Sequence, residues 1–263
     1  MPERNRFLAV TKGVLVPLVL MTALSVRDIA TAVGIRIPGL PLSSYAGSSM
    51  DNLLAVLLVV LAVLVLRPRN VRVSPARLLG LGAHGWRAPC LVLLSTLPFW
   101  ISSALSGSLS ADLDLHGLLF TALLFPLAEE LAFRGFGFIF PRRALGWPMP
   151  LACIVQALCF GAAHWLGMRG SDQAITVFCM TLLGGIVFAV LDALDGYTLW
   201  SGLVFHCSLN AAWSVFDLSG ASGGWGWINN LLRLACAILA VLVLWCIRNK
   251  HHDAAQAPRI DTA

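Results

Sequence analysis

The chain contains several apolar runs of about 20 residues, which is the length that an α-helix needs to cross roughly 30 Å of hydrocarbon. Hydrophobic residues make up 58% of the 263 residues and charged residues only 12%, which is more apolar surface than a water-soluble domain covers. The sequence therefore predicts an all-α, polytopic membrane protein with about eight transmembrane helices. The predicted spans are 7–26, 52–66, 88–108, 117–140, 149–167, 174–194, 197–217 and 228–247.

The loops between these spans leave no room for a soluble domain, and neither internal repeats nor low-complexity tracts interrupt them. We therefore predict one transmembrane domain over residues 1–263. The first run resembles a signal peptide, but it is long and lacks a small-x-small cleavage site, so we expect a retained helix. The Gly- and Trp-rich segment 219–227 predicts a loop at the membrane surface, either an anchor or a lid over a substrate entrance.

Lysine and arginine residues are distributed unevenly between alternate loops. Of the 18 such residues, twelve fall on one side of the predicted membrane, whereas Arg27, Arg36 and Arg169 fall on the other. Because cytoplasmic loops carry the excess of these residues, both termini are predicted to be cytoplasmic, in a membrane of the bacterial inner-membrane type. This arrangement accounts for the net charge of +5, and we expect no nucleic-acid partner.

The fourth span places three charged residues, Glu129, Glu130 and Arg134, near the middle of an apolar helix. Each buried charge costs on the order of 3 kcal/mol on insertion scales, so such residues need a reason to be there. Glu130 and Arg134 are four residues apart and share a helical face, which predicts a buried ion pair. Glu129 is rotated by about 100° from that face, and no local partner is predicted for it.

Two other spans carry polar residues. His164 follows the small residues 161–163, which permit close approach of another helix, and His206 and Asn210 share one face of the seventh span. Each of these is by itself typical of a hydrogen-bonded core residue. Together with Glu129 they suit peptide hydrolysis, in which Glu129 and His164 activate a water molecule and donors from His206 and Asn210 stabilise the oxyanion.

These residues form three motifs in a recognisable order: Glu129-Glu130-x-x-x-Arg134, Phe160-x-x-x-His164 and His206-x-x-x-Asn210. The set resembles the CAAX-protease and bacteriocin-processing (CPBP, or Abi) family of intramembrane proteases, which includes the type II CAAX prenyl endopeptidases. The resemblance covers about residues 115–217, which we predict to be the catalytic core. It implies an intramembrane endopeptidase in which the first glutamate and first histidine activate water, while the second histidine and the asparagine stabilise the oxyanion.

Metal dependence is the main alternative left open by the residues. Two histidines and a glutamate are also the ligand set of some catalytic zinc sites, so a metalloprotease with zinc on Glu129, His164 and His206 is the competing hypothesis. The sequence has no HExxH motif, and its seven cysteines form no CxxC pair. We therefore favour a glutamate-dependent mechanism with no metal cofactor.

Two other functions compete with proteolysis. Buried carboxylates and histidines also build proton relays, so a membrane transporter is one alternative, although no inverted repeat supports it. A non-catalytic immunity or scaffold protein of the same fold is the other. For the protease, the expected partners are the lipid bilayer and a membrane-associated protein or peptide substrate.

The depth of the site can be estimated from the predicted orientation. At about 1.5 Å per residue, Glu129 lies roughly 17 Å and His164 roughly 22 Å from the cytoplasmic ends of their spans. The site is therefore expected to open toward the extracytoplasmic side. This favours the membrane anchor or leader of an exported protein as substrate over a cytosolic prenylated tail.

Overall fold

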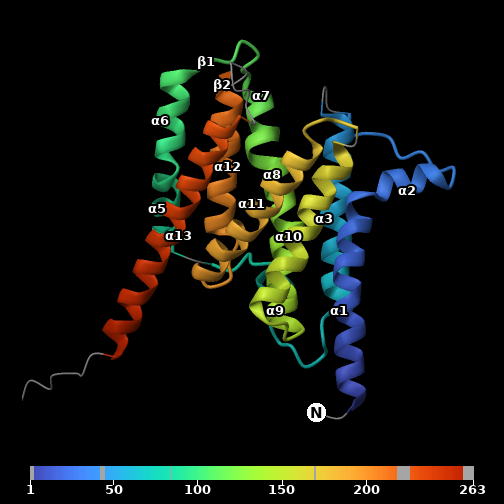
Figure 1. Cartoon of the computed structure of the whole chain (residues 1–263). Coiled ribbons are helices and arrows are strands. Elements are labelled where there is room, and N and C mark those ends of the chain that lie inside the picture. The colour runs from blue at the N-terminus through green and yellow to red at the C-terminus, as the bar shows by residue number, and fades with distance from the viewer. Residues whose placement is uncertain (1–2, 42–44, 84, 169, 218–225, 257–263) are drawn as a thin grey trace, which may run out of the picture.

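The computed structural model describes residues 3–41, 45–83, 85–168, 170–217 and 226–256. In this part of the chain the fold is a bundle of long helices, and the β-structure is one antiparallel pairing of two-residue strands, β1 (Ser108–Leu109) with β2 (Phe216–Asp217) (Figure 1). The predicted all-α membrane architecture is confirmed. Most of the predicted loop 219–227 lies outside the described residues.

The bundle is built from the following helices in chain order, where η denotes a π-helix. They are α1 (Glu3–Leu24), α2 (Val26–Ala32), α3 (Ala46–Leu66), α4 (Pro75–Leu78), α5 (Arg87–Ser95), α6 (Leu97–Ser106), α7 (Leu115–Leu118), η1 (Leu119–Leu124), α8 (Phe125–Glu129), η2 (Glu130–Ile139), α9 (Phe140–Ala144), α10 (Met149–Gly167), α11 (Ala174–Leu194), α12 (Trp200–Val215) and α13 (Trp227–Gln256).

Among the described residues, six helical segments are long and apolar enough to cross a membrane, and the bent pair α1 and α2 makes a seventh. The predicted span 197–217 corresponds to α12, which has only 16 residues. At 1.5 Å per residue it is about 24 Å long, which is shorter than the hydrocarbon core. The helix begins only after a turn in which Gly196 and Tyr197 adopt positive φ angles, and it ends where β2 pairs with β1.

The fourth span is one continuous helical segment, 115–144, but it is not a regular α-helix as predicted. It contains two π-helical stretches, η1 and η2, and each lies shortly before a proline, Pro126 or Pro141. Proline has no backbone N–H, so the carbonyls that precede it in a helix must find other partners. Stretches of π-helix are frequent at functional sites, and here η2 begins at Glu130.

The π-helix η2 is the central element of the bundle, since every residue from Ala132 to Ile139 is buried. It packs against α1, α3, α10 and α11. The close approach of α4 depends on Gly135, because a Cβ there would lie 2.9 Å from the Leu79 carbonyl oxygen. The charged residues at the start of η2 are thereby held deep inside the protein.

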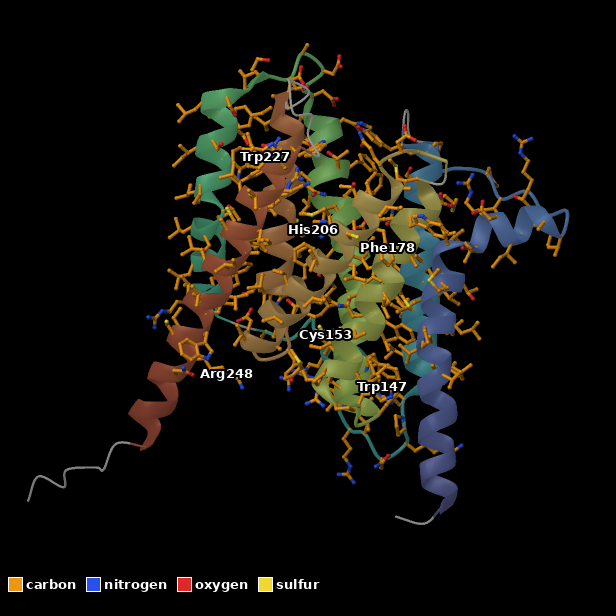
Figure 2. All side chains as sticks on the ribbon, in the orientation of Figure 1. Trp147, Cys153, Phe178, His206, Trp227 and Arg248 are labelled. Carbon is orange, nitrogen blue, oxygen red and sulfur yellow. The ribbon has the colours of Figure 1, made fainter. Side chains whose placement is uncertain are left out.

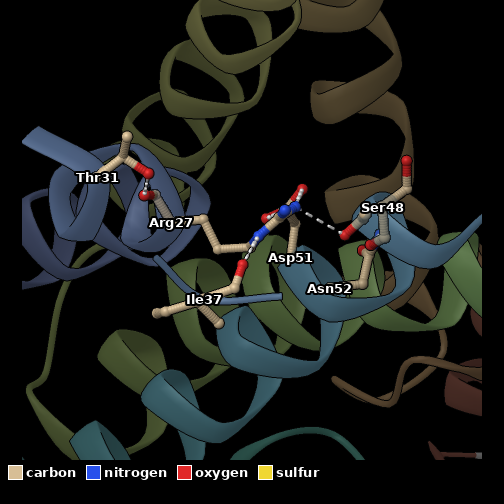
Figure 3. A network of polar contacts seen from close by, with 7 residues as sticks. Arg27, Thr31, Ile37, Ser48, Asp51 and Asn52 are labelled. Carbon is tan, nitrogen blue, oxygen red and sulfur yellow. Dashed lines mark hydrogen bonds and ion pairs between the residues drawn. The ribbon is translucent and has the colours of Figure 1, made fainter. Parts of the chain in front are cut away.

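Helix α2 leaves the bundle at a bend of 75° and projects sideways from the end of α1 (Figure 1). Arg27 fixes this bend, because its side chain donates to the carbonyl oxygens of Ile37 and Gly47 and pairs with Asp51 of α3 at 3.1 Å (Figure 3). Arg27 was predicted from charge counting only as a loop residue. In the structure it ties the loop 33–41 to α3.

Candidate active site

The four residues predicted to be catalytic, Glu129, His164, His206 and Asn210, line a single cavity of about 1020 Å³. They come from the end of α8, the last turn of α10 and the middle of α12. The rest of the wall is mainly apolar and is supplied by α11, α12 and α13. His206 lies in the interior of the bundle, between the end marked by Trp227 and the end marked by Trp147 and Arg248 (Figure 2).

His206 lies between the two adjacent carboxylates. Its Nδ1 is 2.9 Å from Oε1 of Glu130, and its Nε2 is 3.8 Å from Oε2 of Glu129. A carboxylate only accepts hydrogen bonds, so Nδ1 carries the proton in the bond to Glu130. The ring is stacked on Phe188 with centroids 4.9 Å apart, which fixes its plane. Nε2 is thereby held on the side of Glu129, which lines the cavity.

Glu130 and Arg134 form an ion pair with no solvent exposure, in which Nε of Arg134 lies 3.3 Å from Oε2 of Glu130. The guanidinium is also enclosed by two aromatic rings, with its Cζ 4.2 Å from the centroid of Phe160 and 4.6 Å from that of Phe188. Such cation–π contacts compensate part of the lost hydration. Arg134 thus holds Glu130, and Glu130 in turn holds His206.

His164 has a defined tautomer, because its Nδ1 lies 2.9 Å from the carbonyl oxygen of Phe160, one turn earlier in α10. A carbonyl oxygen cannot donate, so the proton of the neutral ring lies on Nδ1. Its Nε2 then has an unprotonated lone pair. A lone pair on the wall of the cavity can accept a hydrogen bond from water or receive a proton from it.

Asn210 is positioned by the π-helix η1. Its Nδ2 donates to the carbonyl oxygen of Thr121 at 3.1 Å, and the Thr121 hydroxyl contacts that of Ser214 at 3.0 Å. One hydrogen of the amide group is used by Thr121, and the other is available to the cavity that Asn210 lines.

A set of polar contacts that orients α12 around Ser208 was not recognised from the sequence. Ser208 lies between His206 and Asn210, and its hydroxyl contacts that of Thr96 at 2.7 Å and accepts from the indole N–H of Trp100 at 2.9 Å. The signal in the sequence was a hydroxyl residue inside an apolar run. These contacts tie α12 to the junction of α5 and α6.

The turn before α12 is held by two carboxylates, Asp192 and Asp195, whose side chains are both buried. Asp192 accepts from the backbone N–H of Gly202 at 3.0 Å, and Asp195 accepts from the hydroxyl of Ser201 at 2.8 Å. Gly202 is one turn before His206, so this polar contact sets where α12 begins relative to α11.

The residues proposed for zinc do not form a ligand cluster. In the described ranges, no group of three or more His, Cys, Asp and Glu side chains is arranged to hold a metal ion. Nδ1 of His206 is engaged by Glu130, and Nδ1 of His164 is engaged by a carbonyl oxygen. Nε2 is then the ring atom that each histidine has left for a ligand, and no step below is assigned to zinc.

A family model matches the part of the chain that carries these residues. Residues 111–212 match the family model described as type II CAAX prenyl endopeptidase Rce1-like. The matched segment includes all three motifs, from Glu129 to Asn210. No curated protein matches the chain at a significant level. The predicted resemblance to CAAX-type intramembrane proteases is therefore confirmed.

Proposed function

Since the chain carries the Rce1-like domain of the type II CAAX prenyl endopeptidases within a multi-pass membrane protein, we propose that it hydrolyses a peptide bond in a membrane-associated protein or peptide. The observation that supports this most directly is that Glu129, His164, His206 and Asn210 line the same cavity. Glu129 and His164, as proton acceptors, and His206 and Asn210, as hydrogen-bond donors, then face the same cavity. The transporter and scaffold alternatives have no comparable support from the family match.

The proposed reaction begins with a water molecule between Glu129 and Nε2 of His164. Glu129 takes a proton from this water molecule while the oxygen of the water attacks the carbonyl carbon of the substrate. The tetrahedral oxyanion accepts hydrogen bonds from the free amide hydrogen of Asn210 and from Nε2–H of His206, in the form of the ring that carries a proton on both nitrogens and donates on both sides. The C–N bond then breaks, and the proton on Glu129 passes to the leaving amine. Oxyanion donors of this kind contribute about 10²- to 10³-fold to the rate.

The wall of the cavity supports a membrane-associated substrate. Leu183 on α11 and Leu231 and Leu234 on α13 line the cavity and are also 48%, 55% and 44% exposed. These helices are candidate membrane spans, so the cavity extends to the apolar outer surface between them. A substrate held in the bilayer can then reach the site without crossing a polar surface.

The orientation proposed for the protein has both termini in the cytoplasm of a bacterial-type cell. The beginning of α1 and the end of α13 lie at the same end of the bundle, which supports their being on one side of the membrane (Figure 1). The excess of arginine in the loops at that end supports its assignment to the cytoplasmic side.

The proposed activity can be tested with the purified full chain in lipid nanodiscs. Two sets of fluorescent peptides would be offered: S-farnesylated peptides ending in a CAAX sequence, and peptides with a hydrophobic membrane-spanning anchor. We expect the wild-type protein to cut at least one set at a single bond, identified by mass spectrometry, and the Glu129→Gln variant to produce no fragment. The absence of fragments from both sets would contradict the proposed activity.

A further inference from the structure

The cavity contains a positively charged residue that lies outside the segment matched by the family model. Arg233 is on α13, whereas the match ends at residue 212. Its side chain lines the cavity together with the four proposed catalytic residues. A guanidinium within a candidate membrane span is costly, and such a group is by default a candidate for function.

The position of Arg233 relative to the proposed catalytic residues follows from its contact with α12. His206, Asn210 and Trp213 are spaced by four and three residues, so they follow one face of this helix. The guanidinium carbon of Arg233 lies 4.6 Å from the centroid of the Trp213 ring. Seven residues of α-helix rise about 10 Å, which places the charge about 10 Å from His206 along the helix axis.

The guanidinium is held in place by its neighbours. Its Nη1 donates to Oδ1 of Asn230 at 3.0 Å, and besides Trp213 it contacts the ring of Phe99 at 5.2 Å. A side chain that is already ordered loses little freedom when it binds a ligand. The planar guanidinium also matches the two oxygens of a carboxylate, and this pairing is stronger in apolar surroundings than in water.

We propose that Arg233 is a specificity-determining residue that binds a carboxylate of the substrate, resting on the proposed function of the neighbouring site. An extended peptide spans about 3.3–3.6 Å per residue, so a distance of about 10 Å corresponds to about three residues between this carboxylate and the bond that is cut. The carboxylate comes either from a free C-terminus or from a Glu or Asp side chain. Arg233 thereby selects which peptide bond reaches Glu129.

The inference is tested first by binding, in the Glu129→Gln background so that the peptides stay intact. The probes are fluorescein-labelled, S-farnesylated heptapeptides of otherwise neutral residues. One has a free C-terminal carboxylate three residues beyond the farnesylated cysteine, one has an amide in its place, and two more are amidated and carry Glu or Gln at that position. We expect at least one of the two carboxylate peptides to bind about tenfold more tightly than its neutral twin.

The variants separate recognition from folding. Adding Arg233→Gln should abolish the tenfold preference and leave the affinity for the amidated peptide unchanged, while Arg233→Lys should retain part of the preference. Arg248→Gln is the matched control on the same helix, because Arg248 donates to the carbonyl oxygen of Ala193 at the far end. This control should keep the full preference.

Cleavage assays with Glu129 restored distinguish failure of this inference from failure of the proposed function. Arg233→Gln should raise KM for the preferred peptide about tenfold with little change in kcat. The protein could cleave the peptides but bind the carboxylate peptide and its neutral counterpart with equal affinity, or Arg233→Gln could lower the affinity for both to the same degree. In either case the carboxylate site is wrong and the proposed protease activity stands. If the preference depends on Arg233 but no peptide is cut, the carboxylate site stands and the protease is wrong.

Discussion

At the scale of single residues, the site is organised around the His206 imidazole, which contacts both Glu129 and Glu130. The two glutamates differ in their surroundings, because the side chain of Glu130 is fully buried against Arg134 while that of Glu129 is 26% exposed. Removing one partner of a buried pair leaves an uncompensated charge, whereas a partly exposed carboxylate can be neutralised at little cost. Their substitutions should therefore have different consequences.

We expect Glu129→Gln to keep the fold and to lower kcat by at least about 10²-fold, because it removes the base that takes the proton of water. Glu130→Gln should instead lower the free energy of unfolding by about 3 kcal/mol, because Arg134 loses its counter-charge. Thermal unfolding in detergent and cleavage per folded molecule measure the two effects separately. Wild-type cleavage by purified Glu129→Gln protein would remove Glu129 from the mechanism.

Metal dependence is also decided at the level of these side chains. If Glu129 and His164 act directly on water, the purified protein should keep its activity after exhaustive chelation. Elemental analysis of the active fraction should then find zinc far below one ion per chain. Activity that disappears with zinc and returns when zinc is restored would favour the metalloprotease instead.

The Glu130–Arg134 pair could be predicted because residues four apart on a helix lie next to each other regardless of how the rest of the protein packs. The contact of Glu130 with His206 could not, since it joins residues 76 positions apart and depends on how α12 is rotated in the bundle. For the same reason the sequence could group Glu129, His164 and Asn210 as candidates but could not place them around one cavity. Nothing local in the sequence indicated that Arg233 lines the same cavity.

At the scale of elements, the junction of α11 and α12 sets the position of His206. A Cβ added to Gly202 would lie 2.6 Å from Oδ1 of Asp192, a buried carboxylate that also accepts from the backbone N–H of Gly202. Either the Asp192 side chain or the two helices would have to shift at this point. His206 lies one turn further along α12, so its contacts with the two glutamates would move with the helix.

We therefore expect Gly202→Ala to destabilise the protein by about 1–3 kcal/mol and to lower kcat in the molecules that remain folded. Gly167→Ala at the end of α10 is a suitable control, because nothing lies within 4 Å of a Cβ built there. Thermal unfolding and single-turnover cleavage of both variants would test this. If Gly202→Ala and Gly167→Ala were equally stable, the junction of α11 and α12 would tolerate the added Cβ and this prediction would be wrong.

The π-helical winding of η1 and η2 is the part of the elements that the sequence pattern did not predict. Apolar periodicity identifies a helical segment, but it does not distinguish i→i+4 from i→i+5 bonding when the residues are apolar on all sides. Pro126 and Pro141 were visible in the sequence, and both π stretches precede them. The depth estimated for Glu129 assumed the rise of a regular α-helix over a segment that is largely π-helical.

At the scale of the whole molecule, the two ends of the bundle differ in charge and connection. One end carries the β1–β2 pairing and the bend into α2, and the other carries α4, α9 and the loop after α3 (Figure 1). The predicted orientation places the second end in the cytoplasm. The helical segments were predictable from apolar length, whereas the bend after α1 and the shortness of α12 depend on contacts made by Arg27, Asp192 and the strand pairing.

Orientation can be tested by cysteine labelling in a variant that lacks the seven native cysteines. Ser108→Cys, at the β1 end, should react with an impermeant maleimide added outside intact cells, and Asn70→Cys, in the loop after α3, should react only after the cells are opened. Both positions are exposed, so the comparison depends on the side of the membrane alone. The opposite labelling pattern would indicate the opposite orientation in the membrane and would favour a cytosolic prenylated tail as substrate.

The buried π-helix makes this protein sensitive to the number of its residues as well as to their kinds. Deleting one residue between Glu129 and Arg134 would shift Glu129 by one helical position, and so by about 100°, relative to Arg134 and the core. Glu129 would then point out of the cavity. The spacing between Glu129 and Arg134 is therefore fixed, because an insertion or deletion within it would separate the base from His206.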